Sequence, residues 1–240
     1  RLPEFVYRAL SKRERVFEIT DTPEAEIVEG LPVFRDTSYK GWLPVMYGCN
    51  NFCSYCVVPL VRGRERSRDP EDVINEAKRL ISEGAKDITL LGQNVNSYGN
   101  NSAFDITFPD LLRKINALDG DFIIRFMTSH PKDCTPELLK AMAESEKCAK
   151  HLHLPFQSGS NRILKAMNRK YTREHYLELV SIARELMPEL SITSDVIVGF
   201  PGEQYEDFLQ TLDLVERVKF SSLFTFIYSK REGTAAAKLQ

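Results

Sequence analysis

The sequence predicts an α/β protein built on a parallel sheet, and two observations support that prediction. Six short apolar runs follow one another along the chain, each rich in β-branched or aromatic residues, as expected of strands buried on both faces. A loop and an amphipathic stretch separate successive runs, at intervals of roughly 30–40 residues, which is typical of right-handed βαβ units. A doubly wound sheet and an incomplete barrel both fit this alternation. In both folds ligands bind at the carboxyl ends of the strands.

The predicted strands are short and largely apolar. They are Leu43–Tyr47, Asp87–Leu91, Phe122–Thr128, His151–Pro155, Ile192–Val198 and Ser222–Tyr228. Four helices are predicted between them, and three have N-terminal signals of the kind that satisfies the first backbone N–H groups. These signals are Asp69 with Pro70, Thr135 with Pro136, and Thr172.

Two of the predicted helices carry apolar stripes that we expect to face the core. In the first helix, which Gly84 ends, the stripe is Val73, Ile74, Ala77, Leu80 and Ile81. In the third it is Tyr176, Val180, Ala183 and Met187. Phe208, Leu212 and Val215 mark the fourth.

The composition is that of an ordinary globular domain, with 42% hydrophobic and 28% charged residues and a net charge of −2. A nucleic-acid partner would therefore need a local basic patch or a further domain. The sequence has no run of about 18 apolar residues and no secretory leader, so we expect no membrane span and a cytoplasmic location. Five cysteines, three of them within eight positions, indicate a metal or cluster site in a reducing compartment rather than a disulfide framework.

The first 40 residues differ from the rest. Basic and acidic side chains alternate from Glu4 to Glu18, and Pro23, Gly30 and Pro32 interrupt the stretch that follows. We interpret residues 1–40 as a connector with one short helix, which leads from an upstream domain into a core domain at residues 41–240. The chain begins with Arg1 instead of Met, as expected of a piece of a longer protein.

The most specific motif is the loop Gly48–Cys56, in which Cys49, Cys53 and Cys56 have the spacing C-x3-C-x2-C. Thiolates hold iron–sulfur clusters, and most clusters use four. Since this loop supplies three, one iron would keep an open position for a substrate or cofactor, by the logic of an open zinc site. A zinc knuckle would need a fourth His or Cys nearby, and none follows Cys56 at suitable spacing. Three unrelated core cysteines in one such loop are the remaining alternative.

This loop, placed after the first strand of a six-fold βα repeat, resembles that of the radical S-adenosylmethionine (SAM) superfamily. The resemblance implies an incomplete (βα)6 barrel, a [4Fe-4S] cluster held by Cys49, Cys53 and Cys56, and SAM chelated at the open iron. It also implies one-electron cleavage of SAM by the cluster, and it names no catalytic residue beyond the cluster ligands. The hard chemistry would then belong to the cofactor.

Six further segments, from about residue 41 onward, resemble the methylthiotransferases of that superfamily. They are residues 57–68, 90–94, 128–131, 153–160, 196–203 and 228–234. The cysteine loop and the run from Arg62 to Arg68 are most similar to the branch that adds a methylthio group to carbon 2 of a prenylated adenosine beside the tRNA anticodon. The branch that modifies ribosomal protein S12 typically has a charged insertion between the first two cysteines and an acidic residue where Arg64 stands, so it is the alternative. A non-enzymatic iron–sulfur module that binds RNA is a third interpretation.

The resemblance also implies partners and further domains. It implies an electron donor such as flavodoxin or ferredoxin, a prenylated tRNA as substrate and a monomeric enzyme. It further implies a second [4Fe-4S] cluster, held by three cysteines of an upstream domain in the full-length protein, and a small C-terminal RNA-binding domain. We therefore expect these 240 residues to cleave SAM without completing methylthiolation.

Residues that follow the predicted strands are the candidate SAM ligands. Gly92, Gln93 and Asn94 follow the second strand, where backbone and amides suit the methionyl amino group. Gln157, Ser158 and Ser160 follow the fourth and suit the ribose hydroxyls. Gly199 and Phe200 follow the fifth, and with Tyr55 they are candidates for the adenine pocket. The competing interpretation is that these segments are ordinary turns and that Tyr55 is a packing residue.

Three other groups of residues have two interpretations each. Arg62, Arg64, Arg66 and Arg68 contact phosphate or carboxylate groups, or they pair with Glu65 and Asp69. His130, His151 and His153 form a metal site, or they are hydrogen-bonded interior histidines, which we favour. Cys134 and Cys148 are expected to be structural thiols.

Overall fold

The computed structural model describes residues 2–17, 27, 29–30, 35–100 and 102–239, which fall into two compact units, Arg1–Leu31 and Pro32–Gln240. The first unit contains helix α1 (Leu2–Ser11), none of whose residues is buried. Much of the predicted connector, residues 18–26, 28 and 31–34, lies outside the described residues. In the described ranges no helix is both long and apolar enough to cross a bilayer.

The second unit is an incomplete barrel of parallel strands. Strands β1 (Lys40–Pro44), β4 (Asp87–Leu91) and β5 (Ile123–Phe126) form one sheet, and β6 (His151–His153), β7 (Ser191–Val198) and β8 (Ser222–Ile227) form another. A parallel bridge from Ile124 to Cys148 links the two. The strands follow chain order, whereas a doubly wound sheet reverses direction at a switch point. Of the two folds that fit the sequence, a doubly wound sheet and an incomplete barrel, the structure is therefore the barrel. The barrel is incomplete because no pairing joins β1 to β8 among the described residues.

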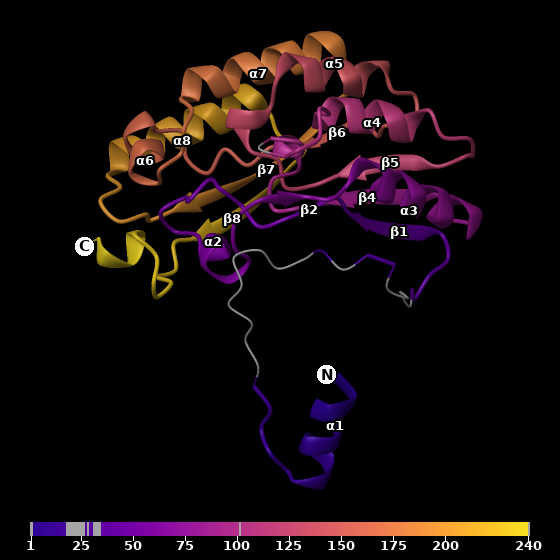
Figure 1. Ribbon diagram of the computed structural model, residues 1–240. Coiled ribbons are helices and arrows are strands. Elements are labelled where there is room, and N and C mark those ends of the chain that lie inside the picture. Colours follow the sequence, from indigo (N-terminus) through magenta and orange to yellow (C-terminus); the bar gives the residue numbers. More distant parts are fainter. Residues whose placement is uncertain (1, 18–26, 28, 31–34, 101, 240) are drawn as a thin grey trace. The chain divides into compact units, whose positions relative to one another are not determined.

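Helices pack against the outer face of these strands, on one side in the view of Figure 1. They are α3 (Pro70–Ser82), α4 (Phe108–Asn116), α5 (Pro136–Glu144), α7 (Arg173–Leu186) and α8 (Tyr205–Val218). Each contacts the next along the chain. Shorter elements are α2 (Val58–Val61), α6 (Asn161–Ala166), and single turns at Val95–Ser97, Pro131–Asp133 and Ala236–Lys238. A continuous apolar core between strands and helices fixes the positions of the strand ends.

The three predicted helix starts are confirmed. The side chains of Asp69, Thr135 and Thr172 accept bonds from backbone N–H groups in the first turns of α3, α5 and α7. Helix α4 was missed, although Thr107 and Asp110 form a reciprocal capping box at its start, which is a recognisable sequence signal.

The predicted position of the first strand is wrong. The apolar run 43–47 spans two elements: β1 begins earlier, at Lys40, and a two-residue strand β2 (Met46–Tyr47) pairs antiparallel with β3 (Arg66–Ser67). Gly41 concealed β1 because glycine is a weak strand former, but a Cβ there would lie only 3.1 Å from Leu80 Cδ1. The strands expected at Phe122–Thr128 and His151–Pro155 end sooner, at Phe126 and His153.

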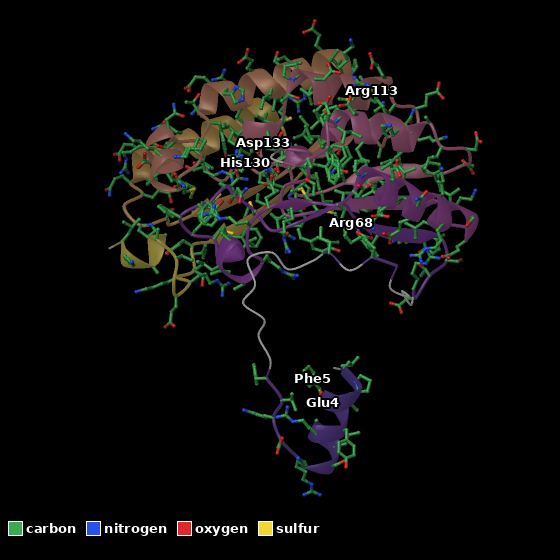
Figure 2. All side chains as sticks on the ribbon, in the orientation of Figure 1. Glu4, Phe5, Arg68, Arg113, His130 and Asp133 are labelled. Carbon is green, nitrogen blue, oxygen red and sulfur yellow. The ribbon has the colours of Figure 1, made fainter. Side chains whose placement is uncertain are left out.

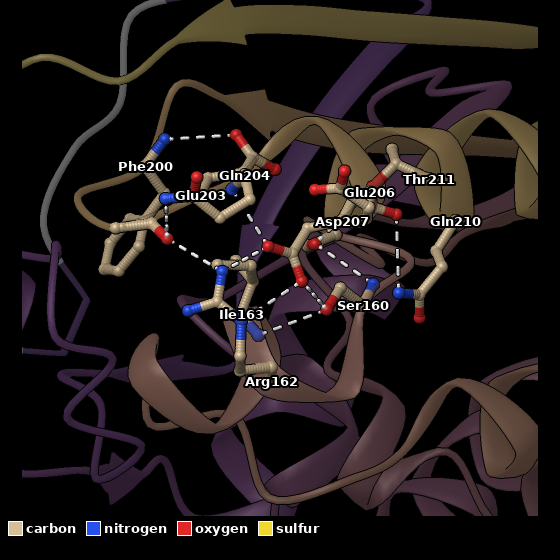
Figure 3. Close-up of polar contacts among 12 residues, drawn as sticks. Ser160, Arg162, Ile163, Phe200, Glu203, Gln204, Glu206, Asp207, Gln210 and Thr211 are labelled. Atoms are coloured by element: carbon tan, nitrogen blue, oxygen red, sulfur yellow. Dashed lines mark hydrogen bonds and ion pairs between the residues drawn. The ribbon is translucent and has the colours of Figure 1, made fainter.

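The fourth predicted helix is confirmed as α8, but polar residues form part of its buried face. Asp207, Thr211, Leu214 and Val218 are the buried residues of α8, whereas Leu212 is 42% exposed. Polar partners explain the difference. Asp207 accepts a bond from Ser160 Oγ at 2.6 Å and pairs with Arg162, as Figure 3 shows. The Thr211 hydroxyl accepts from Gly159 N at 2.9 Å. A search for apolar spacing cannot find such a face.

Candidate functional site

The cysteine loop runs from β2 to α2, and its shape depends on a close approach between two chain segments. Gly48 has φ +72°, and a Cβ on it would lie 2.0 Å from the carbonyl oxygen of Arg64. The pairing of Tyr47 with Arg66 and the bond from Cys49 N to Gly63 O at 3.3 Å continue this contact. The arginine run therefore lies alongside the start of the cysteine loop. Only glycine fits at position 48, because a Cβ there would overlap the Arg64 carbonyl.

The three thiols are partly shielded from solvent. Cys49 is buried and Cys53 and Cys56 are half-buried, and all three are unbridged. Burial raises the pKa of Cys49 and of Cys56, and the neighbouring thiols contribute to the rise. Cys53 and Cys56 line a pocket of about 160 Å³ together with residues of α2 and of the segment 233–235. No three metal-ligating side chains in the described ranges are grouped so as to hold one ion.

Contacts from α6 and the residues after it hold the loop in place. Ser54 donates twice, from its N–H to Met167 O and from its hydroxyl to Ala166 O, both at 2.9 Å. Asn168 Nδ2 donates to Phe52 O at 2.8 Å. The guanidinium of Arg169 reaches Cys53 Sγ, with Nη1 at 3.5 Å. The residues of α6 and of the segment after it were not among the predicted site residues. Nothing in local spacing connects position 54 with position 166.

Buried polar atoms without hydrogen-bond partners gather at the carboxyl ends of the strands. In the described part of the chain they are Gln93 Oε1, Asn94 Oδ1, Ser129 Oγ, Gln157 Oε1, Glu203 Oε1 and Tyr228 OH. Each follows a barrel strand, at the end where the cysteine loop lies. Unsatisfied buried groups of this kind are costly and uncommon. Their concentration at one end, beside three thiols, marks a site that suits a polar ligand.

Backbone strain is found in the same region. Gln157 has φ +63° and Thr128, just after β5, has φ +68°. A β-branched residue in this left-handed conformation is an outlier, and such strain is concentrated at functional sites. Ser129, next to Thr128, is one of the unpartnered groups and was not among the predicted site residues.

The residues expected around adenine come together. Phe200 belongs to a small apolar cluster with Ile163, Met167 and Ala236, against which Tyr55 and Tyr228 pack. The Phe200 and Tyr228 rings meet edge to face at 5.4 Å. Gly199, with φ +69°, has open space where its Cβ would be. Two aromatic rings from different strand ends and Tyr55 of the cysteine loop thus belong to one apolar cluster.

Other predicted ligands have structural partners. Ser158 Oγ accepts from Ser160 N at 3.2 Å, and Ser160 caps α6 and donates to Asp207. These two hydroxyls, which we expected to bind ribose, are therefore used within the fold. Gly92 is explained by packing, since a Cβ there would lie 2.4 Å from Met46 Cγ. Gln93, Asn94 and Gln157 are the members of the predicted set with unpartnered carbonyl oxygens.

The arginine run divides into different environments. Arg62 and Arg64 are exposed, and Arg64 lies 4.6 Å from the centre of the Phe52 ring. Arg68 is buried and pairs with Glu76 at 2.7 Å. Glu65 and Asp69, the acids that the alternative interpretation pairs with these arginines, also have partners elsewhere. The Glu65 carboxylate lies 2.7 Å from the Ser97 hydroxyl, and Asp69 caps α3.

The histidines and the remaining cysteines have structural roles, as expected. His151 Nε2 and His153 Nδ1 share the Thr193 hydroxyl, at 2.9 and 3.0 Å. Burial lowers the pKa of His130 to about 2, and its Nδ1 accepts from Lys132 N; Figure 2 labels it beside Asp133. Cys134 and Cys148 are buried, and burial raises their pKa values to about 12 and about 11.

A three-cysteine loop at the carboxyl end of an incomplete (βα)6 barrel is the defining arrangement of one protein class. The sequence profile of the radical SAM superfamily matches residues 43–215, and the chain belongs to that superfamily. Solved structures agree on the fold. The methyltransferase TsrM from Kitasatospora setae has a TM-score of 0.68 at 19% identity, covering 82% of this chain and 38% of that one. Coproporphyrinogen III oxidase HemN from Escherichia coli has a TM-score of 0.60 at 16% identity, covering 84% and 47%.

More specific relatives are enzymes named tRNA-2-methylthio-N(6)-dimethylallyladenosine synthase. The one from Thermoanaerobacter sp. (strain X514) is 56% identical over 239 residues, which are 100% of this chain and 50% of the relative. The one from Clostridium novyi (strain NT) is 57% identical over 240 residues, 100% and 53%. The chain thus spans about half the length of the curated relatives it matches.

Proposed function

We propose that this chain is the radical SAM core of a tRNA methylthiotransferase, which adds a methylthio group to carbon 2 of N(6)-dimethylallyladenosine. The observation that carries the proposal is identity of 56% along the whole chain to an enzyme named for that reaction. The exposed Arg62 and Arg64 beside the cysteine loop provide cationic side chains near the site, as an RNA substrate requires.

The cysteine loop fits a [4Fe-4S] cluster with one open iron. Cys49, Cys53 and Cys56 would hold it, since thiolates are the usual ligands of such clusters. When bound, the cluster supplies the electron that cleaves SAM to methionine and a 5′-deoxyadenosyl radical. The chain itself positions and shields the group: α6 holds the loop, and burial of Cys49 limits its contact with water.

The strand ends fit SAM. Unpartnered carbonyl oxygens of Gln93, Asn94 and Gln157 can accept bonds from an ammonium group and ribose hydroxyls. The apolar cluster of Tyr55, Phe200 and Tyr228 provides aromatic groups of the kind that contact adenine. Replacing Gln157 by Ala should weaken SAM binding to the reconstituted protein, measured by equilibrium dialysis. Ser158→Ala is the matched control, since its hydroxyl already has partners within the fold.

Further domains and partners belong to the same proposal. Residues 1–40 lead from an upstream domain that holds a second [4Fe-4S] cluster, and residues 41–240 form the radical SAM core. A one-electron donor of the flavodoxin or ferredoxin type reduces the cluster. The enzyme acts as a cytoplasmic monomer on tRNA that already carries the prenyl group.

Mass spectrometry of cellular RNA and protein tests the proposal. Deleting the gene should leave N(6)-dimethylallyladenosine without its methylthio group, and the full-length gene should restore the modification. Loss of a methylthio group from ribosomal protein S12, with tRNA unaffected, would assign the other branch. Absence of 5′-deoxyadenosine from the reconstituted and dithionite-reduced chain would instead indicate a binding module.

A further inference from the structure

Arg169 is a buried cation that is directed at one of the three cysteines. It follows α6, and only 8% of its surface is exposed. Its Nη1 donates to Cys53 Sγ at 3.5 Å, Nη2 to Pro155 O at 2.7 Å, and Nε to Tyr171 OH at 3.0 Å. All three nitrogens of the guanidinium therefore have a partner. The bonds to Pro155 and Tyr171 hold the group in place beside Cys53.

The charge of Arg169 has no conventional counter-ion. Its hydrogen-bond partners are a carbonyl, a phenol and a thiol, and no carboxylate pairs with it in the described ranges. Arginine stays protonated at any ordinary pH. A buried charge is costly unless an opposite charge offsets it. Cys53 is the one partner of the three that a bound metal cluster would hold as an anion.

We propose that Arg169 is a positioning residue that supplies the counter-charge of the Cys53 thiolate and so raises the reduction potential of the cluster. The inference depends on the cluster assignment made under the proposed function. A cluster and its thiolates together become more negative when an electron is added. A fixed cation beside a sulfur ligand stabilises the reduced form more than the oxidised one. Net charge and hydrogen bonds to sulfur are the two factors by which proteins adjust such potentials.

Arg169 differs in this respect from the other cations near the loop. Arg62 and Arg64 are exposed, so water and salt screen their charges. Arg169 acts from within the protein, where an interaction of the same length is stronger. A substitution at position 169 should therefore change the potential more than one at an exposed cation.

Redox titration of the reconstituted chain without SAM or tRNA tests the proposal. The electron donor is dithionite with mediators, and the readout is the electron paramagnetic resonance signal of the reduced cluster. Arg169→Gln should disfavour reduction roughly tenfold, a midpoint about 59 mV more negative for one electron. Arg169→Lys, which keeps the charge but loses the fork of donors, should shift the midpoint less. Lys86→Gln, which removes an exposed cation that pairs with Asp121, should leave it unchanged.

A second control separates electrostatics from packing. Tyr171→Phe removes the phenol that holds Arg169 Nε but leaves the cation beside Cys53. It should lower the melting temperature and leave the midpoint within error of the parent. If Arg169→Gln retains about four irons, a parental midpoint or a more positive one would overturn the inference. If Arg169→Gln fails to retain iron, Arg169→Lys is compared with the parent, and a midpoint more positive than that of the parent would overturn the inference. Neither result affects the proposed function, because the measurement uses no substrate.

Discussion

The Ser54 hydroxyl donates to the Ala166 carbonyl at 2.9 Å, and this bond fastens the cysteine loop to the end of α6 across 112 residues of sequence. The backbone N–H of Ser54 makes a second bond, to Met167. The Ser54 carbonyl accepts a third, from Ala236 N at 2.7 Å. One residue between two cysteines thus connects the loop with two distant segments.

Ser54→Ala should lower the free energy of unfolding by about 1 kcal/mol, since one buried hydrogen bond is lost. It should also speed the loss of iron on exposure to a chelator, because the loop is less firmly held. Ser82→Ala is a control, as that hydroxyl bonds only within the exposed end of α3. Equal iron-release rates for Ser54→Ala and the parent would show that this bond does not hold the loop.

Replacing any one of Cys49, Cys53 or Cys56 by Ala should abolish SAM cleavage and reduce iron to well below four per chain. Two thiolates cannot hold the cluster, and the part of the chain that the structure describes offers no further metal-ligand group to replace the lost thiolate. Iron analysis and chromatography of 5′-deoxyadenosine measure the two effects. Cys148→Ala removes a buried thiol elsewhere and should keep both properties. A loop variant with full iron and normal cleavage would refute the assignment.

The Arg162–Asp207 pair should make stability depend on pH in the acid range. Hydrogen bonds from Arg162 and from Ser160 lower the pKa of Asp207 to about 2, whereas the pKa of an aspartate in an unfolded chain is about 3.9. The stabilisation is therefore complete above about pH 4 and is lost as the pH falls toward 2. Denaturation at a series of pH values should show this loss, and Asp207→Asn should flatten it. Arg162→Gln should move the loss to higher pH.

Arg64 should contact RNA phosphate, because it is exposed beside the cysteine loop. Arg64→Gln should weaken binding of an anticodon stem-loop and reduce the slope of log affinity against log salt by about one unit. Cleavage of SAM without RNA should remain. Lys86→Gln is the matched control, since Lys86 precedes β4 at the opposite end of the barrel. An unchanged slope for Arg64→Gln would mean that Arg64 contacts the Phe52 ring and does not contact RNA phosphate.

Arg68 belongs to the same sequence run but should behave differently. Arg68→Gln breaks a buried ion pair with Glu76 and should cost about 3 kcal/mol of folding free energy. Chemical denaturation measures this cost. Arg64→Gln, at an exposed position, should change stability by less than about 0.5 kcal/mol. A similar small change in Arg68→Gln would mean that the ion pair contributes little.

Local signals in the sequence predicted much of this protein. The cysteine spacing indicated the superfamily because the three predicted cluster ligands lie within one short loop. Caps such as Asp69 and Thr172 were found because a helix start depends on adjacent residues. The strands at Asp87–Leu91 and Ser222–Ile227 were placed to within a residue, since buried strands are short apolar runs.

Tertiary structure decided the rest, because the deciding contacts join residues far apart in the chain. The buried face of α8 contains Asp207 and Thr211, whose partners lie in the segment 159–162. Gly41 lies in β1 close to Leu80, where a Cβ would be 3.1 Å from Leu80 Cδ1. The position of Arg169 against Cys53, 116 residues earlier, has no counterpart in any local pattern. Sequence by itself determined which chemistry the loop supports. Only the folded barrel decided which side chains hold the loop, because packing brings together what spacing cannot relate.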